Sequence, residues 1–201
     1  MNSEKRDYKI DIIRGIAILL VIFGHTITTN NLTGVDDSIL YKVIFSIQMP
    51  LFFLISGYLT SVSKPIIRTS DFLKTIKKRT ITYLYVWFIW SILIRGVLID
   101  RWVLNNVLPN IISLIEDPST GYWFLISIWN MSIFWIISNH VSNKLKLTDE
   151  IKFFLNIALF TGFIGVLIFI GLNIVFNFFA IKYTIYYSTF YLVGVIYNRI
   201  K

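Results

Sequence analysis

The chain has 201 residues, of which 56% are hydrophobic, and its 19 Lys and Arg residues exceed its 11 acidic residues to give a net charge of +8. Several apolar runs approach twenty residues, about the length of helix that crosses the hydrocarbon core of a bilayer. The composition therefore excludes a soluble protein, and the absence of cysteine excludes disulfides, thiolate metal sites and a cysteine nucleophile. The basic residues lie in short segments between the apolar runs, which indicates an integral membrane protein and argues against nucleic-acid binding.

The apolar runs predict an all-α fold, a polytopic transmembrane helix bundle of about six spans that forms one domain over residues 1–201. The first run is too long for the core of a signal peptide and lacks a small-residue cleavage site, so we interpret it as a retained span. The predicted spans are residues 10–29, 41–60, 81–99, 122–140, 153–172 and 181–198.

The charges of the connecting segments predict how the chain is oriented in the membrane. Residues 30–40 contain only two acids and residues 100–121 contain one Arg and three acids, whereas the other segments are basic. The positive-inside rule places the basic segments in the cytoplasm, and with them both chain ends, as an even number of spans requires. The basic residues are Lys5, Arg6 and Lys9 before the first span, Lys64, Arg68, Lys74, Lys77, Lys78 and Arg79 before the third, Lys144, Lys146 and Lys152 before the fifth, and Arg199 and Lys201 after the sixth.

The first span, "DIIRGIAILLVIFGH" from Asp11 to His25, carries ionisable residues where a purely spanning helix would carry leucine. At about 100° per residue, Arg14 and His25 lie on one helix face, roughly 16 Å apart along the axis, and Asp11 is close enough to pair with Arg14. A guanidinium suits phosphate and an imidazole suits proton transfer, so this face fits a long, thin substrate such as acyl-coenzyme A. Taken singly, each residue also fits a structural role: Arg14 snorkels to the headgroups, and His25 hydrogen-bonds a neighbouring helix.

Two further motifs follow, "FFLISG" in the second span and "YWFL" at the start of the fourth. With the first span, they resemble the membrane-bound acyltransferase family 3, which acylates cell-surface sugars and polysaccharides. Its recurrent features are an Arg and a His with ten residues between them, Phe-Phe-x-x-Ser-Gly in the next span, and an aromatic signature further on. The resemblance covers the whole chain, and the motifs fall in the expected order. The corresponding residues here are Arg14 and His25, then Phe52, Phe53, Ser56 and Gly57, then Tyr122 to Leu125.

Two features depart from the family pattern. Family members usually have more spans, so we expect this chain to be an N-terminal portion, a truncated product or a short variant that lacks the C-terminal spans. The family often carries Arg-x-x-Arg before the third span, but "KKRTIT" places Thr82 at the second arginine. Lys77, Lys78 and Arg79 still supply positive charge there, and orientation in the membrane is the simpler role for them.

The resemblance implies an O-acyltransferase of the bacterial cytoplasmic membrane, which moves an acetyl or other short acyl group from acyl-CoA to a hydroxyl of a surface sugar or polysaccharide. It implies that His25 acts as general base or transient acyl carrier, that Arg14 binds coenzyme phosphate and that Asp11 positions Arg14. No permanently bound cofactor is expected, because the acyl-CoA is a substrate, and no metal is expected either. The residues expected to bind substrate are Phe52, Phe53, Ser56, Gly57, Tyr122 and Trp123.

Several of these residues, and the chain as a whole, also fit alternative roles. Ser56 and Gly57 suit helix packing, and the many Trp and Tyr residues suit the membrane interfaces. The competing function is a non-catalytic membrane protein, either an inactive remnant or a carrier. Carriers often pair interrupted helices across two halves, whereas Pro50 marks one bent span without a matching partner, which favours the enzyme. A homo-oligomer that closes the bundle is a further alternative.

Overall fold

The computed structural model describes residues 8–29, 39–61, 65–99, 106–120, 122–173 and 177–200, and these ranges contain helices and turns but no strand. Four of their helices are long and apolar enough to cross a membrane, so the fold is that of an all-α membrane protein, as predicted. Helices are expected in lipid because each backbone N–H and C=O must find its partner within the segment. The chain divides into two compact units, Met1–Ser61 with Phe190–Lys201, and Val62–Thr189.

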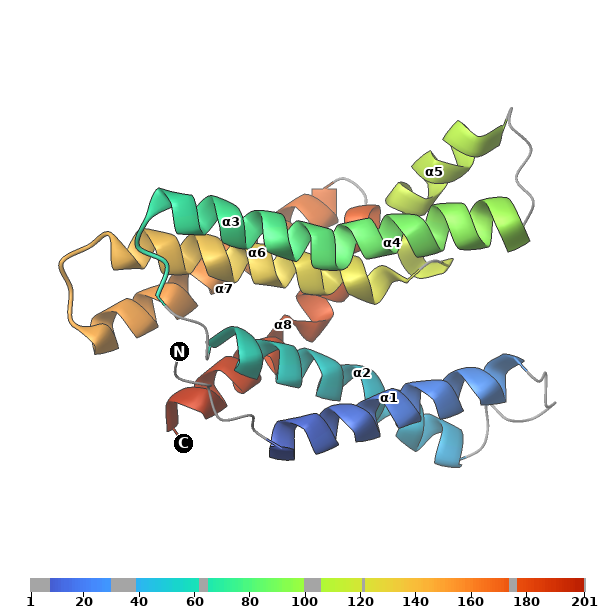
Figure 1. The fold of residues 1–201 in the computed structure, drawn as a ribbon, viewed down its shortest axis with the longest axis horizontal. Helices are drawn as coiled ribbons and strands as arrows, with labels where there is room; N and C mark the ends of the chain where they lie inside the picture. The colour runs from blue at the N-terminus through green and yellow to red at the C-terminus, as the bar shows by residue number, and fades with distance from the viewer. Residues whose placement is uncertain are drawn as a thin grey trace. The chain divides into compact units, whose positions relative to one another are not determined.

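In the first unit, α1 (Tyr8–Thr29) packs against α2 (Ile39–Ser61), and Figure 1 shows the two helices crossing. Ala17 and Gly24, which lie on one face of α1, are buried. Most other side chains of α1 are exposed, among them the large apolar Leu19 and Phe23. The free energy of such apolar side chains is lower in hydrocarbon than in water, so an exposed apolar surface suits a membrane span.

The second helix continues through Pro50, although proline cannot donate a backbone hydrogen bond. Its hydroxyl groups bond to the carbonyls of their own helix: Ser56 Oγ donates to Phe52 O at 2.8 Å, and Thr60 Oγ1 donates to Ser56 O at 2.8 Å. A hydroxyl group that donates to a carbonyl of its own helix satisfies its donor inside a span.

The second half of α8 (Ile181–Ile200) meets α2 through two glycines. A Cβ on Gly57 would lie 1.9 Å from the backbone oxygen of Tyr191, and a Cβ on Gly194 would lie 1.9 Å from the backbone oxygen of Leu54. No side chain fits at either distance, so only glycine allows the two backbones to approach this closely. Small residues serve the same purpose in many pairs of membrane helices.

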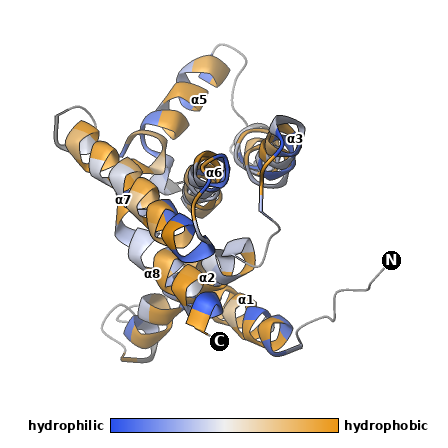
Figure 2. Ribbon diagram, turned by 90° about the vertical axis from the view of Figure 1, so that its left-hand side faces the viewer, coloured by the Kyte–Doolittle hydropathy of each residue, from blue (hydrophilic) through white to orange (hydrophobic). Residues whose placement is uncertain are grey.

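In the second unit, α6 (Trp123–Asn143) packs against α3 (Thr69–Thr80) and α7 (Asp149–Asn173). Figure 2 shows α6 between these two helices and most of α7 in the hydrophobic colour. Helical structure continues without a break from α3 to Ile99. The segments after α3 are the π-helical Ile81–Tyr85, α4 (Val86–Phe88) and the π-helical Ile89–Ile99.

Hydrogen bonds donated by side chains link the helices of the second unit. Asn130 Nδ2 donates to Phe179 O at 3.2 Å and to Thr184 Oγ1 at 3.0 Å, and Trp129 Nε1 donates to Thr80 Oγ1 at 3.1 Å. Phe179 has a φ of 47°, in the left-handed region that is unfavourable for a bulky residue. Its hydrogen bond to Asn130 therefore helps to hold the turn that precedes α8.

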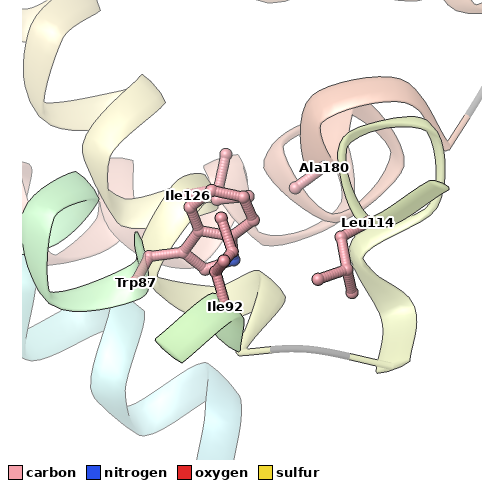
Figure 3. Close-up of a cluster of buried hydrophobic side chains, with 5 residues drawn as sticks. All are labelled: Trp87, Ile92, Leu114, Ile126 and Ala180. Carbon is pink, nitrogen blue, oxygen red and sulfur yellow. The ribbon is translucent and has the colours of Figure 1, made fainter. Parts of the chain in front are cut away.

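An apolar cluster at one end of the second unit joins α5 (Val107–Glu116) to α4, α6 and the turn before α8. Ile111 and Ile115 of α5 also pack against it. Because α5 contributes its buried face to this core, it is a packed helix and not a free connector. The buried members, drawn in Figure 3, are Trp87, Ile92, Leu114, Ile126 and Ala180.

All six predicted spans are helical, and their boundaries lie close to the predicted ones. However, where the sequence predicted six spans, only α1, α2, α6 and α7 of the described ranges qualify by length and composition. The third predicted span is divided into shorter helical segments, and α8 contains polar residues such as Lys182, Thr184 and Ser188. The predicted connectors also hold the helices α3 and α5. Residues 30–38, 100–105 and 121 and the basic residues Lys5, Arg6, Lys64 and Lys201 lie outside the described residues.

Candidate functional site

The first helix brings Arg14 and His25 onto one face. Because α1 is an unbroken α-helix from Tyr8 to Thr29, the two Cα atoms are separated by about three turns, or roughly 16 Å along the axis. Both residues lie about 60–80° around the helix from the buried Ala17, on the same side. The face that they share therefore borders the side on which α1 packs against α2.

Arg14 and His25 are both exposed, and the Arg14 side chain keeps 47% of its accessible surface. Neither is a core residue of the first unit. A cation and an imidazole thus lie at two depths along one accessible helix face, which is the arrangement that a long ligand with a charged end requires.

Asp11 pairs with Arg14, as their spacing predicted. The distance from Arg14 Nη1 to Asp11 Oδ1 is 3.8 Å, and the Asp11 side chain is 31% exposed. Exposed pairs of this kind contribute only about 0–1 kcal/mol to stability. The pair therefore contributes little to the stability of the fold.

The Phe-Phe-x-x-Ser-Gly motif lies in the part of α2 that packs inside the first unit. Phe53 is fully buried and Phe52 is half-buried. Ser56 Oγ already donates to Phe52 O, and Gly57 lies against the backbone of α8. These contacts favour a packing role for Ser56 and Gly57, which the sequence left open beside substrate binding.

Tyr122 and Trp123 belong to the second unit, at the start of α6. Tyr122 has a φ of 42° and its ring tilts against Trp90, with 6.4 Å between ring centroids. Trp123 stacks on Tyr183 and Tyr187 of α8, with centroid distances of 4.0 and 5.5 Å. Trp123 is therefore engaged by neighbouring rings, whereas Tyr122 remains 40% exposed.

Gln48 is a residue that the sequence analysis missed. It lies in α2, is only 4% exposed, and its Oε1 has no hydrogen-bond partner among the described residues. That oxygen lies 2.7 Å from the position that a Cβ on Gly24 would occupy. The sequence feature that points to Gln48 is an amide within the apolar run "FSIQMPLFF", because polar residues inside spans are functional candidates.

His140, near the end of α6, is a buried structural residue. Its Nδ1 donates to Ile66 O at 3.3 Å, and its ring stacks on Phe72 at 4.5 Å between centroids. The neighbouring Asn139 Oδ1 accepts the backbone N–H of Ile66 at 3.0 Å. The end of α6 thus satisfies both backbone groups of Ile66 and fixes the segment that leads into α3.

Three of the basic residues before the third predicted span, Lys77, Lys78 and Arg79, lie in the last turn of α3. Lys77 and Lys78 are exposed, and Arg79 Nη1 donates to Tyr83 Oη at 3.3 Å. Thr82, which replaces the second arginine of the family pattern, donates to Lys78 O. Within the described ranges, no group of three or more His, Cys, Asp or Glu residues has an arrangement that could hold a metal ion.

Together these features define a class: a helical membrane protein with a cation and an imidazole on one face of its first helix. The chain belongs to the acyltransferase 3 family, because the family profile, described as an acyltransferase domain, matches residues 7–201. The match confirms the resemblance that the motifs of the first, second and fourth predicted spans indicated.

Two relatives carry the name nodulation protein NolL. The protein from Sinorhizobium fredii is 30% identical over 128 residues, and the one from Mesorhizobium japonicum is 32% identical over 135 residues. Each match covers 62% of this chain and 34% of the relative, so the chain matches about a third of the length of these proteins. No solved structure matches the chain.

Proposed function

We propose that the protein is a membrane-bound O-acyltransferase that moves an acetyl or other short acyl group from acyl-CoA to a hydroxyl of a cell-surface sugar or polysaccharide. The observation that carries this proposal is that Arg14 and His25 lie on one accessible face of an unbroken helix. Membership of the acyltransferase 3 family supports it. Both relatives are bacterial, which supports the bacterial cytoplasmic membrane as the location.

In this proposal Arg14 binds the phosphates of the acyl-CoA at the cytoplasmic end of α1. A guanidinium offers a planar fork of N–H donors that matches phosphate oxygens. The Asp11 carboxylate, 3.8 Å away, is proposed to orient it. The pantetheine arm then follows the helix toward His25. The roughly 16 Å between the two residues leaves the thioester near the imidazole while the nucleotide stays at the membrane surface.

At the other end, His25 removes the proton of the acceptor hydroxyl. The hydroxyl oxygen attacks the thioester carbonyl, the carbon–sulfur bond breaks, and the imidazolium returns the proton to the sulfur of the leaving coenzyme A. Acid–base catalysis of this kind contributes typically 10²–10⁴-fold to the rate.

The family resemblance also assigns substrate binding to the aromatic residues at the start of α6, and we propose this role within the second unit for Tyr122. The predicted orientation places this end of α6 on the outer side of the membrane. Tyr122 offers an exposed ring, whereas Trp123 is stacked against Tyr183, so Tyr122 is the better contact for a sugar.

The test replaces His25 with Ala and measures the O-acetyl content of the cell-surface polysaccharide in cells that depend on this protein. Acetylation should fall by at least the 10²-fold that a general base contributes. Thr26→Ala is the matched control, because Thr26 is the exposed neighbour and its hydroxyl donates to Ile22 O within α1. Unchanged acetylation with His25→Ala present in the membrane at the normal amount would contradict the proposal.

A further inference from the structure

Gln48 stands out among the buried polar groups of the first unit. Its side chain is 96% buried, yet its Oε1 accepts no hydrogen bond from any described residue. Buried amide oxygens nearly always have a donor, because water no longer solvates them. An orphaned acceptor inside a membrane helix pair therefore calls for a donor that reaches it in another state of the protein.

The backbone of α1 is shaped to receive this amide. Gln48 Oε1 and Nε2 would lie 2.7 and 3.4 Å from a Cβ on Gly24, so the amide lies against the backbone of Gly24 where any side chain would displace it. The residue after Gly24 is His25. The orphaned oxygen thus lies against the residue that precedes His25, whose imidazole transfers the proton in the proposed function.

The residue that follows Gly24 in α1 carries a donor of the right kind, the imidazole of His25. His25 is exposed, so its side chain has room to turn about its Cα–Cβ bond. Of its two ring nitrogens, Nδ1 is the one closer to the backbone of α1, and the Gln48 amide lies against that backbone at Gly24. A hydrogen bond from one ring nitrogen decides which tautomer forms, and such bonds often tighten only when substrate is bound.

We propose that Gln48 is a positioning residue whose Oε1 accepts the Nδ1–H of His25 and so keeps Nε2 unprotonated and directed at the substrate hydroxyl. The functional meaning of this bond depends on the proposed acyl transfer, but the bond itself does not. A simple helix clamp, the alternative role for Gln48, would leave the tautomer of His25 unaffected.

The direct test is nitrogen NMR of the full chain labelled with ¹⁵N-histidine, because the sequence holds only His25 and His140. The unaltered protein should show His25 mainly as the Nδ1–H tautomer. Gln48→Met, which keeps the length of the side chain but removes the acceptor, should move His25 toward Nε2–H and leave His140 unchanged. Gln48→Glu, which keeps an acceptor oxygen, should retain Nδ1–H. Identical His25 signals in the unaltered protein and Gln48→Met would overturn the proposal.

The kinetic test compares the same variants with Ser91→Ala, which removes a buried hydroxyl of the second unit that likewise has no partner among the described residues. Gln48→Met should lower kcat by about 10–100-fold, as loss of an orienting partner does at other sites, with unchanged KM values. Gln48→Glu and Ser91→Ala should both retain the kcat of the unaltered protein.

An active protein in which Gln48→Met keeps its full kcat would overturn the role of Gln48 and leave the proposed function standing. If the unaltered protein transfers no acyl group, the proposed function fails, and the NMR experiment still decides the hydrogen bond.

Discussion

Arg14 and Lys152 form similar ion pairs in different helices, so Lys152 serves as a control for Arg14. Each cation lies three residues after an aspartate, with nitrogen–oxygen distances of 3.8 Å to Asp11 and 3.7 Å to Asp149. Both pairs should contribute little to stability. They differ in that only Arg14 shares a helix face with His25.

We expect Arg14→Ala to raise the KM for acetyl-CoA about tenfold to a hundredfold, with a smaller change in kcat. A hydrogen bond to a charged group contributes about 1.5–3 kcal/mol, which corresponds to that range. Lys152→Ala should leave both constants unchanged. The measurement is the initial rate of acyl transfer against acetyl-CoA concentration, and an unchanged KM in Arg14→Ala would contradict a phosphate-binding role.

Single residues were predictable from the sequence only where the helix alone fixes their relation. The common face of Arg14 and His25 and the pairing of Asp11 with Arg14 follow from 3.6 residues per turn. The environment of Gln48 depends on Gly24 of another helix, and that of His140 depends on Ile66 and Phe72, far away in the chain. No local pattern contains such contacts.

At the scale of elements, the contact between α2 and α8 should depend on its two glycines. Gly57→Ala and Gly194→Ala each place a methyl group against a backbone oxygen, so the helices must move apart. We expect each substitution to destabilise the protein by roughly 1–3 kcal/mol, as overpacking does elsewhere. Thermal unfolding in detergent, followed by circular dichroism, measures the effect.

Gly162 and Gly165 of α7 provide the control for this prediction. A Cβ on either residue meets no atom of the described chain within 4 Å, and alanine favours a helix over glycine by about 1 kcal/mol. Gly162→Ala and Gly165→Ala should therefore leave the unfolding temperature unchanged or raise it slightly. Equal effects of all four substitutions would show that the close approach of α2 and α8 does not contribute to stability.

The sequence predicted the long apolar helices well because their boundaries follow the runs of apolar residues. It did not predict α3 and α5, which lie in segments taken as connectors. The helix α3 is too polar to be found by hydropathy, and α5 is too short to span the membrane. Both pack against other helices, and that packing stabilises helices which are marginal on their own.

At the scale of the whole molecule, the testable property is the orientation in the membrane. Ser119 lies in the predicted outer segment and Lys146 in a predicted cytoplasmic one, and both are exposed. Because the chain has no cysteine, Ser119→Cys and Lys146→Cys each introduce a single thiol. A maleimide that cannot cross the membrane should label Ser119→Cys in intact cells and label Lys146→Cys only after the cells are permeabilised.

The reverse labelling pattern would place the basic segments outside and would contradict the positive-inside interpretation. It would also place Arg14 at the outer end of α1, away from cytoplasmic acyl-CoA. The same experiment thus tests the proposed binding of acyl-CoA from the cytoplasmic side.

The sequence by itself determined that the protein is an all-α membrane protein of the acyltransferase 3 family, and that Arg14 and His25 share a face. Hydropathy and helix periodicity are local properties, so the order of residues is enough to establish them. Only the tertiary structure decided that Gly57 packs against α8, that Ser56 bonds within its own helix, and that Gln48 lies beside Gly24 with an oxygen left unpaired by the described residues. Except for the Ser56 bond, these facts depend on which surfaces of distant segments meet, and that is settled by packing over the whole unit.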